Sequence, residues 1–241
     1  MAIIYQKANP LQKKARRYLT AGICFAIPLV LYMLAFFLYR FHFAGVYHLL
    51  PMLLFGWPAA LLCRKYQILK AGLNGEKTAL STFSNLPDDY YVFTTVCSEF
   101  EGKKGEMDCL VVGRNGLFAV EVKNHNGKIC AVEGEEYWEQ HKVGQAGGRY
   151  SKQIRNPIKQ TKRNIYILSQ SLKNKGVRAW IEGLVYFTNK KVEIDYIPEG
   201  CYQSGDEIND YITSYIPKHS LSQEELKKVV AVLLGGYKKA V

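Results

Sequence analysis

The stretch at residues 106–123 constrains the fold most, because it reads as two apolar strands joined by a tight turn. Asn115-Gly116 between two apolar runs is the strongest short-range signal for a β-hairpin. With these two residues as the turn, Asp108 lies opposite Lys123, whereas a four-residue loop places Asp108 opposite Glu121. In both registers Asp108, Glu121 and Lys123 project from one face. A three-residue loop separates them unless a bulge restores the phase.

The opposite face of this hairpin is apolar and is expected to be buried; it carries Cys109, Val111, Phe118, Val120 and Val122. Two carboxylates and a lysine at the end of such a hairpin form a charged pocket beside a hydrophobic floor. Neighbouring carboxylates repel and favour a cation between them, and hard oxygen ligands favour Mg²⁺ or Mn²⁺. The alternative is a solvated strand end with a Glu–Lys ion pair.

Charge, length and cysteine usage bound the class of protein. The 241 residues carry a formal net charge of +11, which favours an anionic partner, either nucleic acid or a lipid surface. The length suits one medium-sized domain with an appendage. The six cysteines are scattered without a CxxC pair, which indicates a reducing compartment and argues against a disulfide framework or a zinc site.

Two long uncharged runs, residues 19–39 and 43–63, predict an N-terminal helical hairpin in a lipid bilayer, since about twenty apolar residues span one as a helix. Basic residues flank the outer ends more heavily than the connecting turn, which predicts that both ends are cytoplasmic. A cleaved signal peptide fits less well, because a second run follows and no small-residue cleavage site is evident. The alternatives are a re-entrant second segment, which contains Pro51 and Pro58, and a buried hairpin of a soluble core.

These patterns divide the chain into five segments. We expect a basic cytoplasmic lead at 1–18, a two-helix transmembrane hairpin at 19–63 and a juxtamembrane linker at 64–71. An α/β domain then occupies 72–190, and a C-terminal extension at 191–241 packs on it.

The α/β domain is expected to begin with a helix over residues 71–86, started by Asn74 or Gly75. A strand at 90–97 precedes the hairpin. A long helix then opens at Asn156-Pro157, with Asn as the N-cap and Pro at the first helical position.

The start of this helix is strongly basic. Four side chains are candidate contacts to nucleic-acid phosphates: Lys152, Arg155, Lys159 and Arg163. Such charges also suit a solvated helix face; beside an acidic metal site, phosphate contact is equally favoured. His125 and His141 have no further ligands in sight, so a zinc site there is disfavoured.

The order of elements and acids resembles the nuclease-related domain (NERD) family of the restriction-endonuclease-like PD-(D/E)xK superfamily. The resemblance covers about residues 72–190, and the residues that carry it are Gly75-Glu76, Glu106-Met-Asp108, Gly116–Asn124, Gly127, Trp138 and Asn156–Gln160. An ExK motif alone is common, and the ordered set is the more specific signal. The residue before Asp108 is Met107 rather than Pro, a departure that is frequent in this superfamily.

This resemblance implies an αβββαβ core with a mixed central sheet and a metal-dependent phosphodiesterase acting on DNA. It implies Mg²⁺ or Mn²⁺ on Asp108 and Glu121, with Glu76 as an auxiliary acid. Lys123 is then expected to orient or activate the attacking water, and Gln160 to support the site from the helix.

Two other classes of function compete with the nuclease, since fold alone does not settle activity. One is a non-catalytic module that holds nucleic acid or a protein partner at the cytoplasmic face of the membrane. The other is a structural membrane protein whose soluble domain contacts anionic lipid.

Overall fold

The computed structural model describes residues 1–39, 47, 49–144, 147–235 and 237–239. The chain divides into two compact units, which are described separately. Unit 1 comprises Met1–Ala8 and Gly75–Val241, and unit 2 comprises Asn9–Asn74.

Unit 2 is helical. It contains α1 (Pro10–Tyr39), α2 (Leu49–Pro51), a π-helical turn at Met52–Gly56 and the first part of α3 (Trp57–Ser84). A Cβ at Gly22 of α1 would lie 3.4 Å from Cys63 Sγ of α3, so a small residue lets the two helices approach closely. The Lys65 ammonium lies 5.6 Å from the centre of the Tyr18 ring.

Within the described residues, one helix is long and apolar enough to cross a membrane. It covers Pro10–Leu38, and its most apolar stretch has a mean hydropathy of 2.4 and is 6% buried. By length and composition, this N-terminal helix fits a membrane span or a signal sequence. The second predicted span, residues 43–63, lies partly outside the described residues, and its described part runs on into α3.

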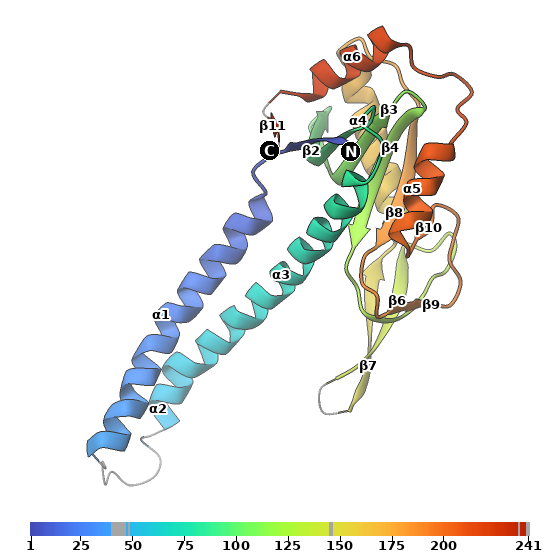
Figure 1. The fold of residues 1–241 in the computed structure, drawn as a ribbon. Helices are drawn as coiled ribbons and strands as arrows, with labels where there is room; N and C mark the ends of the chain where they lie inside the picture. Colours follow the sequence, from blue (N-terminus) through green and yellow to red (C-terminus); the bar gives the residue numbers. More distant parts are fainter. Residues whose placement is uncertain (40–46, 48, 145–146, 236, 240–241) are drawn as a thin grey trace. The chain divides into compact units, whose positions relative to one another are not determined.

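Unit 1 is an α/β domain built on a seven-stranded mixed sheet of order β10-β8-β4-β3-β2-β1-β11 (Figure 1). The strands are β1 (Ile3–Gln6), β2 (Tyr91–Phe100), β3 (Lys103–Gly113), β4 (Gly116–Lys123), β8 (Ile181–Phe187), β10 (Cys201–Tyr202) and β11 (Lys238–Lys239). β8 is parallel to β4, whereas β4, β3 and β2 are antiparallel in succession. The predicted α/β class with a mixed sheet is confirmed.

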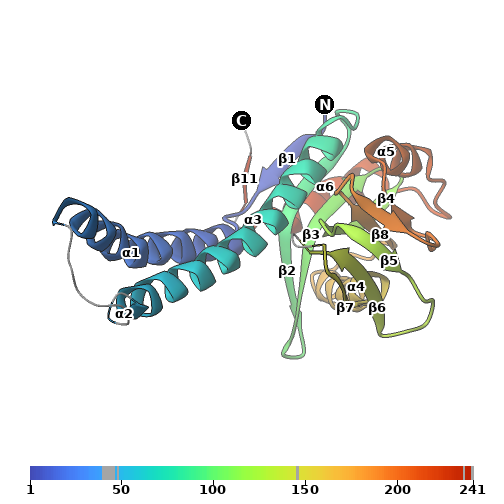
Figure 2. The ribbon, with the colours of Figure 1, turned by 90° about the horizontal axis from the view of Figure 1, so that it is seen from below.

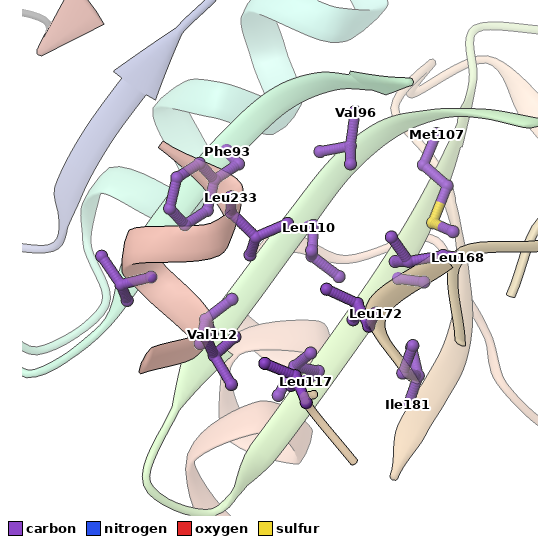
Figure 3. Close-up of a cluster of buried hydrophobic side chains, with 14 of the residues drawn as sticks. Phe93, Val96, Met107, Leu110, Val112, Leu117, Leu168, Leu172, Ile181 and Leu233 are labelled. Carbon is purple, nitrogen blue, oxygen red and sulfur yellow. The ribbon is translucent and has the colours of Figure 1, made fainter. Parts of the chain in front are cut away.

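Helices cover both faces of this sheet. α4 (Pro157–Asn174) and α6 (Gln223–Leu233) cover one face, and the end of α3 with α5 (Gly205–Ser214) covers the other. A first apolar core fills the space between the sheet and the face covered by α4 and α6. Figure 3 shows it, with Leu168 and Leu172 of α4 beside Leu110 and Leu117 of the hairpin. The second core contains the apolar hairpin face predicted from the sequence, from Cys109 to Val120, and both faces of the hairpin are therefore anchored.

A second, four-stranded sheet follows the order β7-β6-β5-β9. Its strands are β5 (Gly127–Cys130), β6 (Tyr137–Val143), β7 (Arg149–Arg155) and β9 (Val192–Ile194). A third core joins it to β8, because Ile129, Trp138 and Ile154 pack with Val185 and Phe187. This sheet arises mainly from the residues between the hairpin and α4.

β1 is a strand that the sequence analysis did not predict, within the segment expected to be a basic lead. It runs parallel to β2 and antiparallel to β11 (Figure 2). The Tyr5 ring stacks on Phe93 with centroids 5.1 Å apart. Four residues are too short a run to indicate a strand against the basic sequence that follows. The N-terminal residues therefore belong to the sheet of unit 1.

The predicted start of a helix at Asn74 or Gly75 is wrong, because α3 is continuous from Trp57 to Ser84. A glycine inside a helix costs only about 1 kcal/mol relative to alanine, so glycines alone need not end one. Gly75 instead permits close packing: a Cβ there would lie 2.7 Å from Asn124 Cβ and 3.0 Å from Thr188 Oγ1. The helix thereby reaches the ends of β4 and β8.

Candidate active site

The β3–β4 hairpin has the register that places Asp108 opposite Glu121. Gly113 pairs with Gly116, so Arg114-Asn115 forms the turn. The turn expected one residue later along the chain is wrong, and the register of the four-residue alternative is the one found. Because the two registers differ by an even number of residues, the charged side chains stay on one face.

Tertiary contacts explain the position of this turn. Tyr90 Oη donates a hydrogen bond to Asn115 Oδ1 at 3.1 Å, and Asn115 Nδ2 donates to the Ile212 carbonyl at 2.5 Å. Gly116, with φ +138°, closes the turn in a conformation that suits glycine. Asn115 is thus held by α5 and by the start of β2.

Asp108 and Glu121 lie where two strands diverge. β3 continues along β2, whereas β4 continues along β8, and the last pair across the hairpin precedes these two residues. Where the strands diverge, Asp108 Oδ2 accepts a hydrogen bond from the Val122 N–H at 2.7 Å. The side chain of Asp108 therefore takes the place of a main-chain carbonyl as the partner of this N–H. The sheet itself therefore brings the two carboxylates together.

Glu121, Lys123 and Gln160 form a hydrogen-bonded triad beside Asp108. Glu121 Oε1 accepts from Lys123 Nζ and from Gln160 Nε2, both at 2.7 Å. Lys123 Nζ also donates to Gln160 Oε1 at 3.0 Å. The amide of Gln160 therefore bridges both charged groups, and it restricts where the ammonium points.

The cap of α4 sets the position of Gln160. Asn156 Oδ1 accepts from the Ile158 and Lys159 N–H groups at 2.9 and 3.3 Å, as predicted for an N-cap. Its Nδ2 donates to the Glu135 carbonyl at 2.8 Å, and the side chain is buried. Gln160 N–H donates to the Asn156 carbonyl at 3.1 Å, which places Gln160 one turn into the helix.

The electrostatics of the pair disfavour two negative charges. Burial, with the neighbouring Asp108, raises the pKa of Glu121 to about 7 despite the opposing effect of Lys123. Burial also raises the pKa of Asp108, while the Val122 N–H and Lys123 act in the opposite direction. A cation between the carboxylates relieves this cost.

Glu76 approaches from the other face of the sheet. Burial, Asp108, Glu76 and Glu121 together raise the pKa of the Cys109 thiol, in that order of effect, so the three carboxylates surround one buried side chain. Cys109 packs in the core that contains the end of α3, which carries Glu76. The structure thus brings Glu76 near Cys109, the neighbour of Asp108 in the chain.

The candidate phosphate contacts are spread over two elements. Lys152 and Arg155 are exposed on β7, and Arg163 is exposed on α4. Lys159 is half-buried and pairs with Glu136 at 3.4 Å.

Sequence reasoning missed three residues near the site. Glu106 adds to the raised pKa of Asp108, and its place two residues earlier on β3 is a signal that was present. Burial, followed by Lys123, Lys142 and Lys152, lowers the pKa of His125 to about 4. Lys142 was missed because only the second sheet brings it near His125, whereas His125 follows Lys123 by two residues and is weighed above only as a zinc ligand.

The donor set is compatible with a hard divalent cation. Among the described residues, no group of three or more His, Cys, Asp or Glu side chains is arranged to hold a metal ion. Mg²⁺, however, is often held by one or two carboxylates, with waters and substrate phosphate completing the shell. Asp108 Oδ1 and Glu121 Oε2 lie outside the hydrogen bonds above, and they are the oxygens that would hold the ion.

Comparison with known families gives one match in the same region. A family model described as nuclease-related domain (NERD) matches residues 71–188, which include all of the predicted catalytic residues. Comparisons with curated proteins and with solved structures found no match.

Proposed function

We propose, from the premise that residues 71–188 form a nuclease-related domain, that this chain hydrolyses phosphodiester bonds in nucleic acid, with DNA the favoured substrate. Asp108 and Glu121 hold Mg²⁺ or Mn²⁺ in this proposal. The observation that carries it is the triad of Glu121, Lys123 and Gln160 at the fork of β3 and β4. A solvated ion pair needs neither a buried carboxylate nor a bridging amide.

The chain's own groups divide the work. Mg²⁺ held by Asp108 and Glu121 would supply an activated water and would neutralise charge on the scissile phosphate. Lys123 presents its ammonium where negative charge grows on the phosphate oxygens, and such a preoriented donor needs no reorganisation during the reaction. Gln160 holds that ammonium and Glu121 in one arrangement. Glu76 acts as an auxiliary acid from α3.

The domain is proposed to be anchored by two membrane-spanning helices, with both termini cytoplasmic. Support comes from β1, which precedes α1 and yet pairs in the same sheet as the strands that follow α3. Both ends of unit 2 therefore lead into unit 1, and a chain that returns to its starting side crosses a membrane an even number of times. With α1 as one crossing, residues 43–63 supply the second.

The side is inferred from charge and cysteine chemistry. Lysines and arginines near both outer ends of the helical unit favour the cytoplasm. All six cysteines are free, as a reducing compartment keeps them. In spheroplasts with an intact membrane, a membrane-impermeant maleimide should leave the exposed Cys97 unlabelled until the membrane is opened; labelling of intact spheroplasts would contradict this topology.

The decisive experiment is a nuclease assay on the full chain in detergent, because a fragment beginning at residue 71 lacks β1. Linear, circular and single-stranded DNA are incubated with Mg²⁺, Mn²⁺ or EDTA. We expect cleavage only with metal, none in Asp108→Asn, and a loss of about 100- to 1,000-fold in Lys123→Met. Glu224→Gln and Lys227→Met are matched controls on exposed positions of α6 and should cleave normally.

A different outcome points to the competing class. If no condition gives cleavage while salt-sensitive DNA binding persists, the hydrolytic proposal is wrong and the domain is a tethered binding module. Binding that survives in Asp108→Asn separates the loss of chemistry from the loss of substrate.

A further inference from the structure

The β6–β7 ribbon carries basic and aromatic side chains on one face. In its register, Lys142 pairs with Tyr150 and Gln140 pairs with Lys152. Cross-strand partners and residues two apart on a strand share a face. Lys142, Tyr150 and Lys152 therefore project on the same side of the ribbon as Gln140.

That side is turned toward the candidate active site. Gln140 is buried, and its Nε2 donates to the Asn126 carbonyl at 2.7 Å. Lys142 lies against Gly127, where a Cβ would be 3.4 Å from Lys142 Cγ. Asn126 and Gly127 belong to the segment that follows Lys123, so these contacts hold the ribbon against the chain just beyond the end of β4.

The positive charges on this face are those of Lys142 and Lys152. In the described part of the chain, neither Lys142 nor Lys152 forms an ion pair with a carboxylate, whereas Lys128 pairs with Asp195 at 2.8 Å. Burial and the nearby Lys152 lower the pKa of Lys142, as expected where two ammonium groups approach each other. The positive charges of Lys142 and Lys152 also help to lower the pKa of His125. An anion placed here gains from all of these charges.

A hollow of about 670 Å³ lies along the ribbon, where Lys142 and Tyr150 of this face line it together with His141, Val143, Arg149 and Ser151 of the opposite face. Its charged lining consists of Lys128, Lys142, Arg149 and Glu193, with His141 at its wall. Tyr150 also lines it, and this ring is 52% exposed. The hollow therefore combines cations with an accessible aromatic surface.

We propose that this face of the ribbon binds an unpaired strand of nucleic acid, with Lys142 and Lys152 on backbone phosphates and the Tyr150 ring stacked on a base. Cations that follow the backbone and aromatic rings that accept bases are the two means by which proteins hold single strands. In a duplex the base faces are already stacked, so Tyr150 has none to meet. The inference rests on the proposed function, because the strand held here is the substrate of the proposed site, and Lys142, Lys152 and Lys123 all lie close enough to His125 to lower its pKa.

The test measures binding by the full chain in EDTA, where cleavage does not interfere. Fluorescence anisotropy with a labelled oligothymidylate and with a duplex of equal length is recorded over a KCl series. We expect tighter binding of the single strand. Tyr150→Ala should weaken it about 5- to 150-fold, while Tyr150→Phe retains it. Tyr137→Ala is the matched control, since Tyr137 is exposed on the other face of β6.

The lysines are tested by salt dependence. Removing a phosphate contact should lower the slope of log K against log[salt] by about 0.7 for a single strand. We expect this change in Lys142→Ala and Lys152→Ala and none in Lys227→Ala. Tighter binding of the duplex, equal effects of Tyr137→Ala and Tyr150→Ala, or unchanged slopes in both lysine variants would each overturn the inference.

The two proposals fail separately. Metal-dependent cleavage by a wild type that fails these binding tests leaves the hydrolytic function standing and removes the strand-binding face. Strand binding as described, without cleavage under any metal condition, supports the face and refutes the hydrolysis.

Discussion

Glu121→Gln should stabilise the metal-free protein above neutral pH. The pKa of Glu121 is raised from 4.5 to about 7, chiefly by burial, and the side chain is only 5% exposed, so solvent screens little of this effect. At about 1.4 kcal/mol per pH unit, ionising Glu121 in the folded state costs about 3 kcal/mol relative to the unfolded chain. Glutamine keeps an oxygen acceptor for Lys123 and Gln160 but never ionises.

The raised pKa of Glu121 determines how the stability difference between wild type and Glu121→Gln changes with pH. Below about pH 4.5 the carboxyl is protonated in both states, and wild type and variant should be equally stable. As the pH rises from about 4.5 through about 7, the wild type loses about 3 kcal/mol of stability relative to the variant. For a chain of this size about 3 kcal/mol corresponds to a Tm lower by about 6–12 °C. Mg²⁺ should restore the wild type at pH 8 more than it affects the variant.

Thermal unfolding in detergent with EDTA, at pH 4.5, 6, 7 and 8, measures this difference. Glu224→Gln, on the exposed first turn of α6, is the control and should follow the wild type throughout. A Tm difference between wild type and Glu121→Gln that does not change with pH would refute the reasoning, because burial would then carry no charge penalty.

Three further predictions follow from the contacts. Gly75→Ala should lower the free energy of unfolding by about 1–3 kcal/mol and reduce cleavage, because the new Cβ meets Asn124. Gly72→Ala has open space around it and should raise the free energy of unfolding by about 0.5–1 kcal/mol. Chemical unfolding measures both changes. Asn156→Ala should lower the free energy of unfolding by about 1–2 kcal/mol and reduce kcat. Ser222→Ala, which removes the capping box that Ser222 forms with Glu225 at the start of α6, should destabilise the fold similarly without changing kcat. Gln160→Ala should reduce activity or metal affinity about 10- to 100-fold with little change in Tm, and a metal titration of cleavage would show it.

Local patterns were readable wherever a short stretch determines its own conformation. The alternation along the hairpin identified the face that carries Asp108, Glu121 and Lys123, because the period of a strand is two whatever the turn. Asn156 was readable as a cap, since an N-cap needs only a side-chain acceptor and the next turn of helix.

Signals that depended on distant residues were misread or missed. The local sequence predicts the turn one residue too late, because Tyr90 and Ile212, which hold Asn115, lie far from it in the chain. Gly75 by its residue type predicts a helix start, whereas in the structure a glycine is needed there because Asn124 approaches the backbone closely.

The sequence by itself determined the α/β class, the apolar helix near the N-terminus and the face on which the candidate catalytic side chains stand. Only the tertiary structure decided that β3 and β4 diverge at Asp108, that β1 joins the sheet, and that Lys142 and Lys152 approach His125. The physical reason is that periodicity and capping act within a few residues. Strand divergence and the meeting of two sheets depend instead on which distant segments pair and pack, and the local sequence does not encode that choice.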